Sequence, residues 1–224
     1  MNETPLLPLL RRMIAEQGPI SVAAYMALAL GHPRHGYYMT RDPFGVRGDF
    51  MTAPEISQLF GECLAVWCAL NWDAMRRPLP VRVVELGPGR GTLMADVMRT
   101  LERIAPDLAR GAAIHLVETS PALRTKQEGA LRGRRVAWHD TLARVPAGPL
   151  LLVANEFFDA LPVEQFVRAG EGWRERVVDW DEAAQRLVFR AGPPLPGAVP
   201  PELAAAPEGG VYEISPAATA LAEE

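Results

Sequence analysis

The stretch VRVVELGPGRGTL, residues 81–93, decides the fold of this chain. Its first six residues have the apolar character of a buried strand, and Gly87, Gly89 and Gly91 follow at once. Glycines allow the backbone to turn sharply and to approach a ligand closely. Because the next residues have helical periodicity, the stretch predicts a strand, a ligand-binding loop and a helix in direct succession.

Predicted strands and helices alternate from this stretch onward, which predicts a parallel sheet with right-handed crossovers. The later strands are expected at residues 113–118, 135–139 and 150–154, and the helices at residues 92–110 and 121–131. We therefore expect a doubly wound, mostly parallel, Rossmann-like α/β sheet. An antiparallel β insertion is predicted at about residues 163–190, where short apolar runs alternate with glycine and polar turns.

The segment before residue 81 predicts helices and one long loop. Apolar residues recur at helical spacing in residues 6–30, with a break at Gly18-Pro19, and again in residues 54–75. Residues 31–54 between them are rich in glycine, proline and aromatic residues, and loops of such length are usually functional. We expect residues 1–80 to supply N-terminal helices and a lid loop, and residues 81–224 to form the ligand-binding α/β domain.

The chain ends early for such a domain. A predicted strand at residues 211–214 leads into Ser215-Pro216, which has the form of a helix start, and the chain stops eight residues later. Because only four parallel strands are predicted before this point, we expect the α/β domain to be truncated at its C-terminus.

The composition argues against several classes of protein. A formal net charge of −4 and a pI near 5.7 provide no basic field that would attract nucleic acid. Cys63 and Cys68 have the spacing of neither a disulfide framework nor a zinc site, and no metal site is expected. The apolar residues 21–30 are too few to span a bilayer and lack the pattern of a secretory signal. We therefore expect no membrane insertion and a cytoplasmic location.

The charge near the glycine loop indicates the kind of ligand. Glu85 lies two residues before the first glycine, where a carboxylate would repel a pyrophosphate but could bind the amino group of a methionyl moiety. The spacing G-x-G-x-G also differs from the G-x-G-x-x-G of dinucleotide sites. Both observations favour S-adenosylmethionine over NAD as the ligand.

Two further acids follow predicted strands. Glu118 is placed to accept hydrogen bonds from both ribose hydroxyls, and Asp140 to accept one from an adenine amino group. The alternative is that each acid caps the following helix, and for Asp140 this alternative is as strong as the binding role. These residues complete the cofactor site predicted from the chemistry, which consists of Glu85, Gly87, Gly89, Gly91, Glu118 and Asp140.

The motif NEFFDALP, residues 155–162, follows the fourth predicted strand, which should flank the first one at the switch point of the sheet. An amide, carboxylates and aromatic rings in one loop could hold a nitrogen nucleophile, neutralise a guanidinium and shield a sulfonium. Positioning would supply much of the rate of a methyl transfer. The candidate catalytic residues are Asn155, Glu156 and Asp159.

Four motifs resemble the MidA-like family, which comprises the mitochondrial complex I assembly factor methyltransferase and its bacterial relatives. The motifs are GYY at residues 36–38, GDFMTAPEISQLFGE at residues 48–62, ELGPGRG at residues 85–91 and NEFFDALP. The resemblance implies a seven-stranded methyltransferase fold, S-adenosyl-L-methionine as donor, S-adenosyl-L-homocysteine as product, and a protein arginine on a respiratory complex I subunit as acceptor. It also implies that residues 48–58, including Gly48, Asp49 and Phe50, fold over the cofactor, and that Asn155, Glu156 and Asp159 face the substrate. Family members continue well past residue 224.

Alternatives stay open at some positions and for the function as a whole. Tyr37, Tyr38 and Phe50 could stack on adenine or pin the loop to the core, while His32 and His35 fit a loop or lid role better than a metal pair. The alternative function is a donor-binding assembly factor for a respiratory complex without turnover. A nicotinamide-dependent oxidoreductase is disfavoured by the glycine spacing. A protein substrate is the expected partner, and a homodimer is kept as a hypothesis.

Overall fold

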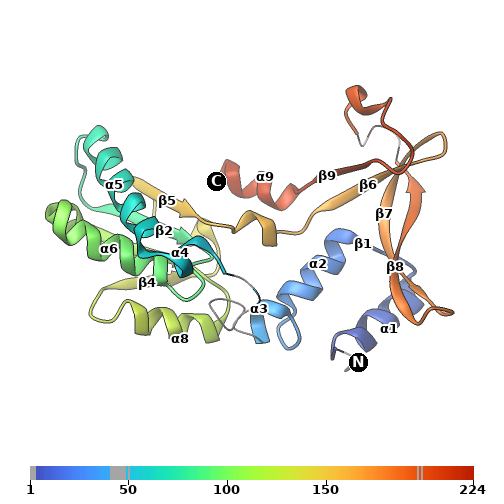
Figure 1. Cartoon of the computed structure of the whole chain (residues 1–224), viewed down its shortest axis with the longest axis horizontal. Helices are drawn as coiled ribbons and strands as arrows, with labels where there is room; N and C mark the ends of the chain where they lie inside the picture. The colour runs from blue at the N-terminus through green and yellow to red at the C-terminus, as the bar shows by residue number, and fades with distance from the viewer. Residues whose placement is uncertain (1–3, 41–48, 50, 196, 198) are drawn as a thin grey trace. The chain divides into compact units, whose positions relative to one another are not determined.

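The computed structural model describes residues 4–40, 49, 51–195, 197 and 199–224 (Figure 1). The chain divides into two compact units, the first built from residues 1–40 and 160–223 and the second from residues 41–159. The sequence instead placed a division at residue 80. The difference has a physical reason: the helix before residue 80 packs its buried face on the parallel sheet and belongs to the same apolar core.

The second unit contains the predicted parallel sheet. Its strands are β2 (Val81–Leu86), β3 (Ala112–Val117), β4 (Val136–His139) and β5 (Leu150–Ala154), in the order β4-β3-β2-β5. All three pairings are parallel, with Val83 opposite Ile114 on one side and opposite Leu151 on the other. The order reverses between β2 and β5, which is the switch point at which open α/β sheets bind ligands. The predicted Rossmann-like fold and the placement of β5 beside β2 are confirmed.

Helices connect and cover this sheet. They are α4 (Ala53–Ile56), α5 (Gln58–Ala74), α6 (Thr92–Ile104), α7 (Pro106–Gly111), α8 (Pro121–Ala130) and the 3₁₀ turns η1 (Leu142–Arg144) and η2 (Phe158–Ala160). Ala65 and Cys68 of α5 and Val97 of α6 are buried with Val83 of β2 in one apolar cluster. Burial of each valine, leucine or methionine side chain in this cluster contributes roughly 1.5–3 kcal/mol, so the cluster stabilises the sheet and the helices that flank it.

Two predicted helices are each divided in the structure. Ser57 interrupts the helix predicted at residues 54–75, because its backbone is extended and its hydroxyl accepts a hydrogen bond from the N–H of Leu59 at 3.2 Å, which starts α5 anew. Pro106 divides the helix predicted at residues 92–110, because proline has no N–H to continue α6 and instead begins α7.

The first unit contains an antiparallel sheet, as the sequence predicted. Its elements are α1 (Leu7–Gln17), β1 (Ile20–Ser21), α2 (Val22–Gly31), α3 (Tyr37–Thr40), β6 (Glu164–Ala169), β7 (Gly172–Asp181), β8 (Arg186–Pro194), η3 (Pro201–Leu203), β9 (Val211–Ile214) and α9 (Pro216–Glu223). The strand order is β1-β7-β6-β9, with β8 also paired to β7. Leu10, Ile14 and Val22 are buried with Val178 and Trp180 of β7 in a second apolar cluster. Each unit therefore has its own core.

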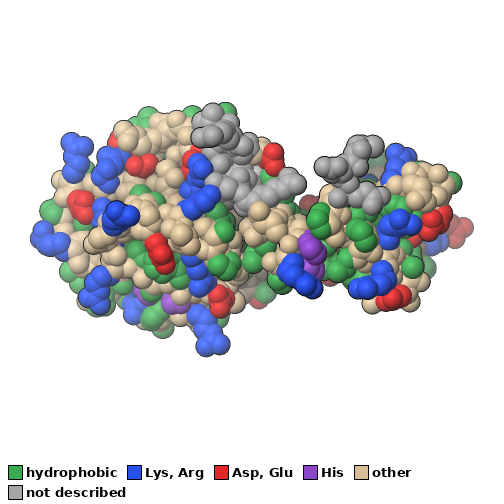
Figure 2. All heavy atoms as spheres, turned by 90° about the horizontal axis from the view of Figure 1, so that it is seen from below, with side chains coloured by type: hydrophobic (Ala, Val, Ile, Leu, Met, Phe, Trp, Pro, Cys, Tyr) green, Lys and Arg blue, Asp and Glu red, His purple; other side chains and the backbone are tan. Residues whose placement is uncertain are grey.

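The surface shows no single charged field on the face drawn in Figure 2. Among the described side chains on that face, Lys and Arg are scattered and Asp and Glu lie between them. No helix in the described part of the chain is long and apolar enough to cross a membrane.

Candidate functional site at the carboxyl ends of the parallel strands

The glycine loop follows β2 and leads into α6. Gly87 has a φ of +60°, and a Cβ atom at this position would lie 2.6 Å from Cδ2 of Phe157. Gly91, the N-cap of α6, has a φ of +83°, and its Cβ would lie 3.2 Å from Cα of Gln127 in α8. Glycine is therefore required at both positions, because the backbone conformation and the close neighbours each disfavour a side chain.

The parallel pairing brings the predicted residues to one edge of the sheet. Gly87 follows β2, Glu118 follows β3, Asp140 follows β4 and Asn155 follows β5. Hydrogen bonds continue the ladder past the strands, since the N–H of Gly87 donates to the carbonyl of Val117 and the N–H of Glu118 to that of His139, each at 3.0 Å. The acids and glycines named from sequence thus lie around one switch point.

Glu85 is buried, and its burial favours the protonated form. Its side chain is 3% exposed, one carboxyl oxygen has no hydrogen-bond partner, and burial raises the pKa of Glu85 to about 8 although the backbone N–H of Met94 in α6 donates to the carboxyl group. From sequence, Glu85 was expected to be a carboxylate. In the structure, burial outweighs the hydrogen bond from Met94 and favours the neutral form of Glu85.

Glu118 lies on the same face of the sheet as Glu85. Glu85 is opposite Leu116 in the register, and alternate residues of a strand point to the same side. Oε1 of Glu118 accepts a hydrogen bond from the N–H of Ser120 at 2.8 Å, and Oε2 accepts one from Nε2 of Gln127 at 3.2 Å. Burial raises the pKa of Glu118, and these hydrogen bonds and nearby Arg124 only partly oppose it. Because Ser120 is the N-cap of α8, Glu118 also contributes to the start of that helix.

Gln127 was not predicted from sequence. It is fully buried, and its amide also bonds the carbonyl of Gly89 at 2.8 Å and the indole Nε1 of Trp138 at 2.9 Å. The available signal was its position in α8, because Gln127 is four residues from Leu123 and from Leu131, both of which are buried. A polar residue within a buried helical stripe needs partners, and here the partners belong to the candidate site.

Asp140 is engaged by Arg124. Its side chain is 79% exposed, and Oδ1 accepts a hydrogen bond from Nη2 of Arg124 at 2.7 Å. The Arg124 guanidinium also donates to the carbonyl of Glu118. An adenine amino group would therefore meet Asp140 as part of an ion pair.

The candidate catalytic residues follow β5. Asn155 is half-buried, whereas Glu156 and Asp159 are exposed. Glu156 has a φ of +50°, a strained conformation for a residue with a side chain and one that occurs preferentially at functional sites. The ring of Phe157 lies on Gly87, and Phe158 meets it edge to face at 5.7 Å between centroids. The loop is thus fixed to the glycine loop by Phe157 while its carboxyl groups stay accessible.

Glu55 joins the segment before α5 to the glycine loop. Its Oε1 accepts a hydrogen bond from the hydroxyl of Thr92 at 2.6 Å, and its Oε2 lies 3.4 Å from Nη1 of Arg90. Glu55 lies within residues 48–58, which the family resemblance places over the cofactor, but no individual role was predicted for it. Gly48 and Phe50 lie outside the described residues, and Asp49 is exposed.

The aromatic and histidine residues of the GYY region belong to the first unit. Tyr37 and Tyr38 meet edge to face at 5.4 Å between ring centroids. The rings of His32 and His35 stack at 5.0 Å, and Nδ1 of His32 accepts hydrogen bonds from the backbone N–H groups of Arg34 and His35. Nδ1 of His32 is therefore engaged by its own loop. Within the described residues, no group of three or more His, Cys, Asp or Glu side chains is arranged to hold a metal ion.

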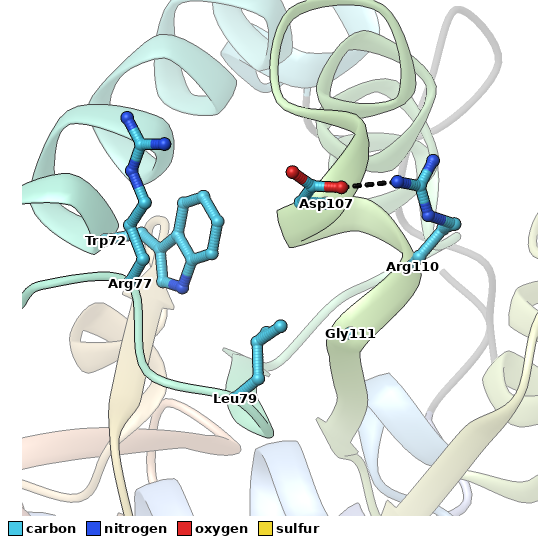
Figure 3. Close-up of a pocket in the computed structure, with 6 residues that line it drawn as sticks. All are labelled: Trp72, Arg77, Leu79, Asp107, Arg110 and Gly111. Carbon is cyan, nitrogen blue, oxygen red and sulfur yellow. Dashed lines mark hydrogen bonds and ion pairs between the residues drawn. The ribbon is translucent and has the colours of Figure 1, made fainter.

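A separate hollow of about 420 Å³ lies at the amino ends of β2 and β3 (Figure 3). It is lined by Trp72, Arg77, Leu79, Asp107, Arg110 and Gly111. Arg77 pairs with Asp73 and its guanidinium lies over the ring of Trp72, and Arg110 pairs with Asp107. Because both arginines have acidic partners, this hollow offers no net charge to a ligand, and the carboxyl ends of the strands are the stronger candidate site.

Comparison with known proteins identifies relatives over most of the chain. A family model described as S-adenosyl-L-methionine-dependent methyltransferase matches residues 63–224. The mitochondrial protein arginine methyltransferase NDUFAF7 of Danio rerio is 41% identical over 203 residues, which are 81% of this chain and 48% of that protein. The Homo sapiens protein of the same name is 38% identical over 218 residues, 85% of this chain and 49% of that protein. The chain thus spans about half the length of these curated relatives.

A solved structure has a similar fold. A Burkholderia thailandensis protein crystallised with S-adenosyl-homocysteine superposes with a TM-score of 0.79 and 35% sequence identity, covering 96% of this chain and 57% of that one. The two proteins are therefore similar in both fold and sequence.

Proposed function

Because this chain belongs to the family of S-adenosyl-L-methionine-dependent methyltransferases, we propose that its second unit binds that donor at the carboxyl ends of β2, β3 and β5. We further propose that the activity is N-methylation of a protein arginine. The names of the curated relatives, which are protein arginine methyltransferases, support this acceptor. S-adenosyl-L-methionine is the cofactor of the family, and S-adenosyl-L-homocysteine is the product that remains after transfer.

The observation that carries the proposal is a pair of buried acids on one face of the sheet beside the glycine loop. In this proposal Glu118 accepts hydrogen bonds from the ribose hydroxyls, and its buried carboxyl group is already held in place by Ser120 and Gln127. Glu85 receives the amino group of the methionyl moiety, whose positive charge favours the ionised form of the acid. Gly87, Gly89 and Gly91 let the backbone approach the ligand. Asp140, with Arg124, lies at the adenine end.

Residues at the end of β5 act on the acceptor. The cofactor supplies a methyl group on a cationic sulfur, and the acceptor nitrogen forms a bond to this carbon as the carbon–sulfur bond breaks and the sulfur keeps the electron pair. Glu156 and Asp159 hold the guanidinium by paired hydrogen bonds, and one of them accepts the proton that the nitrogen loses. Asn155 orients the acceptor from the half-buried side. Alignment of these groups supplies most of the rate.

For the cellular setting we propose a cytoplasmic bacterial protein that acts on a subunit of respiratory complex I. The word mitochondrial in the names of the relatives supports a connection to respiration. The segment containing Gly48, Asp49 and Phe50 is proposed to cover the bound cofactor, and a homodimer is the proposed assembly. The competing function, a donor-binding assembly factor without turnover, predicts the same binding and no product.

Calorimetry with S-adenosyl-homocysteine tests the donor site. Glu118→Ala should abolish binding while circular dichroism stays unchanged, whereas Glu128→Ala, which removes an exposed carboxyl group one residue after Gln127, should bind like the parent protein. Undiminished affinity of Glu118→Ala would refute the ribose assignment.

Transfer of a labelled methyl group tests catalysis. Glu156→Gln should retain donor affinity and lose turnover, because the amide cannot accept the proton or neutralise the guanidinium. Full activity of Glu156→Gln would remove this residue from the mechanism. Absence of product from the parent protein with a complex I acceptor would favour the binding function instead.

A further inference from the structure

The amide of Gln127 joins three elements of the candidate donor site. Nε2 donates to the carbonyl of Gly89 at 2.8 Å and to Oε2 of Glu118 at 3.2 Å, and Oε1 accepts from Nε1 of Trp138 at 2.9 Å. A glutamine amide has two N–H donors and one acceptor oxygen, so each kind of group has a partner. No solvent contributes, because the residue is 0% exposed.

Trp138 determines which way the amide faces. An indole N–H can only donate, so the atom of Gln127 beside it must be the oxygen. The NH₂ group is then directed to Gly89 and Glu118, both of which present acceptors. The orientation of the amide therefore follows from the chemistry of its neighbours and does not depend on a choice between nitrogen and oxygen.

We propose that Gln127 is a positioning residue for donor binding, which holds the carboxylate of Glu118 and the carbonyl of Gly89 in the arrangement that receives the ribose of the adenosyl group. This inference rests on the proposed function. Gln127 acts through these two groups, because its side chain is fully buried and its amide is bonded to both of them. The ligand class is a nucleoside with two free ribose hydroxyls.

The number of acceptor sites on Glu118 supports this role. A carboxylate offers about four lone-pair sites, two on each oxygen. The backbone N–H groups of Ser120 and Thr119 and the amide of Gln127 all donate to this carboxyl group, with Ser120 on Oε1 and Gln127 on Oε2. Three donors on about four sites leave room for a ligand hydroxyl. Without Gln127 the carboxyl group would lose its side-chain donor and would be held by the two backbone N–H groups of its own loop.

Gln127 also holds the glycine loop in place. The carbonyl of Gly89 lies between two glycines with positive φ, where the backbone has many accessible conformations. The hydrogen bond from Gln127 fixes this carbonyl, and the Cα of Gln127 is near enough to Gly91 that a Cβ there would lie 3.2 Å away. The position of α8 thus determines the shape of the loop as well as the direction of Glu118.

Gln127→Met tests the proposal, because methionine has nearly the same volume and no hydrogen-bonding amide. Binding of S-adenosyl-homocysteine is measured by calorimetry between pH 6 and 8.5, with Glu128→Met on the exposed side of α8 as the matched control. We expect the dissociation constant of Gln127→Met to rise about tenfold or more at pH 7.5, the loss typical of a hydrogen bond to a charged group. Glu128→Met should stay within twofold of the parent.

The pH profile distinguishes positioning from a merely structural role. Loss of the Gln127 donor raises the pKa of Glu118 further, so the variant loses the ionised carboxylate at a higher pH than the parent. The ratio of the two dissociation constants should therefore grow as the pH falls. Arg124, Asp140 and His139 also face this region, and Glu85 titrates nearby, but they are common to both proteins and cancel in the ratio.

The outcomes separate this inference from the function on which it rests. If the parent protein does not bind S-adenosyl-homocysteine, the proposed function fails. If the parent binds and Gln127→Met binds within twofold of it at every pH, only the positioning role fails, and a ratio that is raised but constant with pH also overturns it. Should Gln127→Met not fold, Trp138→Phe frees the amide to turn while leaving Gln127 in place, and its affinity should fall about threefold with the same trend in pH.

Discussion

Replacing Glu85 by glutamine should stabilise the ligand-free protein, and the gain should depend on pH. The carboxyl group is buried beneath α6, one of its oxygens has no partner, and burial raises its pKa to about 8 from an ordinary value of 4.5. Glutamine keeps an oxygen that can accept the N–H of Met94 and has no charge to bury. The substitution therefore removes a titration without removing the hydrogen bond.

The magnitude follows from the two pKa values. Because the pKa is raised on folding, the folded state holds a proton that the unfolded state releases, and stability is complete below pH 4.5 and is lost as the pH rises through about 8. Each unit of pH between these values costs about 1.4 kcal/mol, so the loss is about 1 kcal/mol at pH 5.5, about 3 kcal/mol at pH 7 and about 5 kcal/mol above pH 8. The glutamine variant has no such loss.

Urea unfolding of both proteins at pH 5.5, 7 and 8.5, followed by circular dichroism, measures this difference. The stability advantage of Glu85→Gln should increase by about 3 kcal/mol from the lowest to the highest pH. Glu128→Gln, at an exposed position, is the control for removing one carboxyl group. An advantage that stays constant with pH would show that Glu85 is not protonated in the folded protein, and the account of its burial would be wrong. Affinity for S-adenosyl-homocysteine should fall in the same variant.

Three further substitutions test the packing around the site. Gly61→Ala would place a methyl group 2.6 Å from a side chain of α6, so the unfolding free energy should fall by about 1–3 kcal/mol in urea, while Gly129→Ala, with nothing within 4 Å, should raise it slightly. Gly87→Ala would place Cβ 2.6 Å from the ring of Phe157 at a φ of +60°, and calorimetry should show a loss of affinity for S-adenosyl-homocysteine of about tenfold or more. Glu55→Gln weakens the attachment of α4 to the glycine loop, and the same measurement should show about a threefold loss. Unchanged affinity would separate that contact from the donor site.

The sheet and its switch point could be predicted because they depend on local patterns and on general rules of connection. Alternating strands and helices require parallel pairing and right-handed crossovers, and these rules place the ends of β2, β3 and β5 together. Glu118 and Asn155 were therefore brought near Gly87 by topology alone. The side-chain environments of these residues could not be predicted, because they depend on helices from other parts of the chain that pack against the strand ends.

Gln127 shows why part of the site was not predicted. Its three partners lie 38, 9 and 11 positions away in the sequence, and only the packing of α8 brings them together. The same holds for Asp140, whose carboxylate is joined to Arg124 across 16 positions. The protonation of Glu85 was also missed, because the degree of burial follows from the assembled core and not from the residue type.

The motif at residues 48–62 contacts α6 at several positions, which gives it a structural role. Glu55 accepts a hydrogen bond from the hydroxyl of Thr92 at the start of that helix. Further along α6, Arg99 donates hydrogen bonds to Gln58 and Glu62. A Cβ atom at Gly61 would lie 2.6 Å from the Cβ of Asp96. The sequence resemblance predicted that residues 48–58 cover the cofactor, and this stays a prediction. The described part of the motif contacts α6, whose N-terminus completes the glycine loop.

The two buried acids are prepared for their partners in different ways, and this difference bears on ligand choice. Glu118 is held by Ser120 and Gln127, so its geometry is set before any ligand arrives. Glu85 has one bare oxygen and holds a proton at neutral pH, so its charge develops only when a cation approaches. A neutral Glu85 gains no charge pairing from a diphosphate, whereas a ligand ammonium group favours loss of the Glu85 proton and then forms a buried ion pair with the carboxylate. If the donor binds beside Glu85 as proposed, its ammonium group shifts this carboxyl group toward the ionised form, and we expect binding near pH 7 to release protons to the buffer.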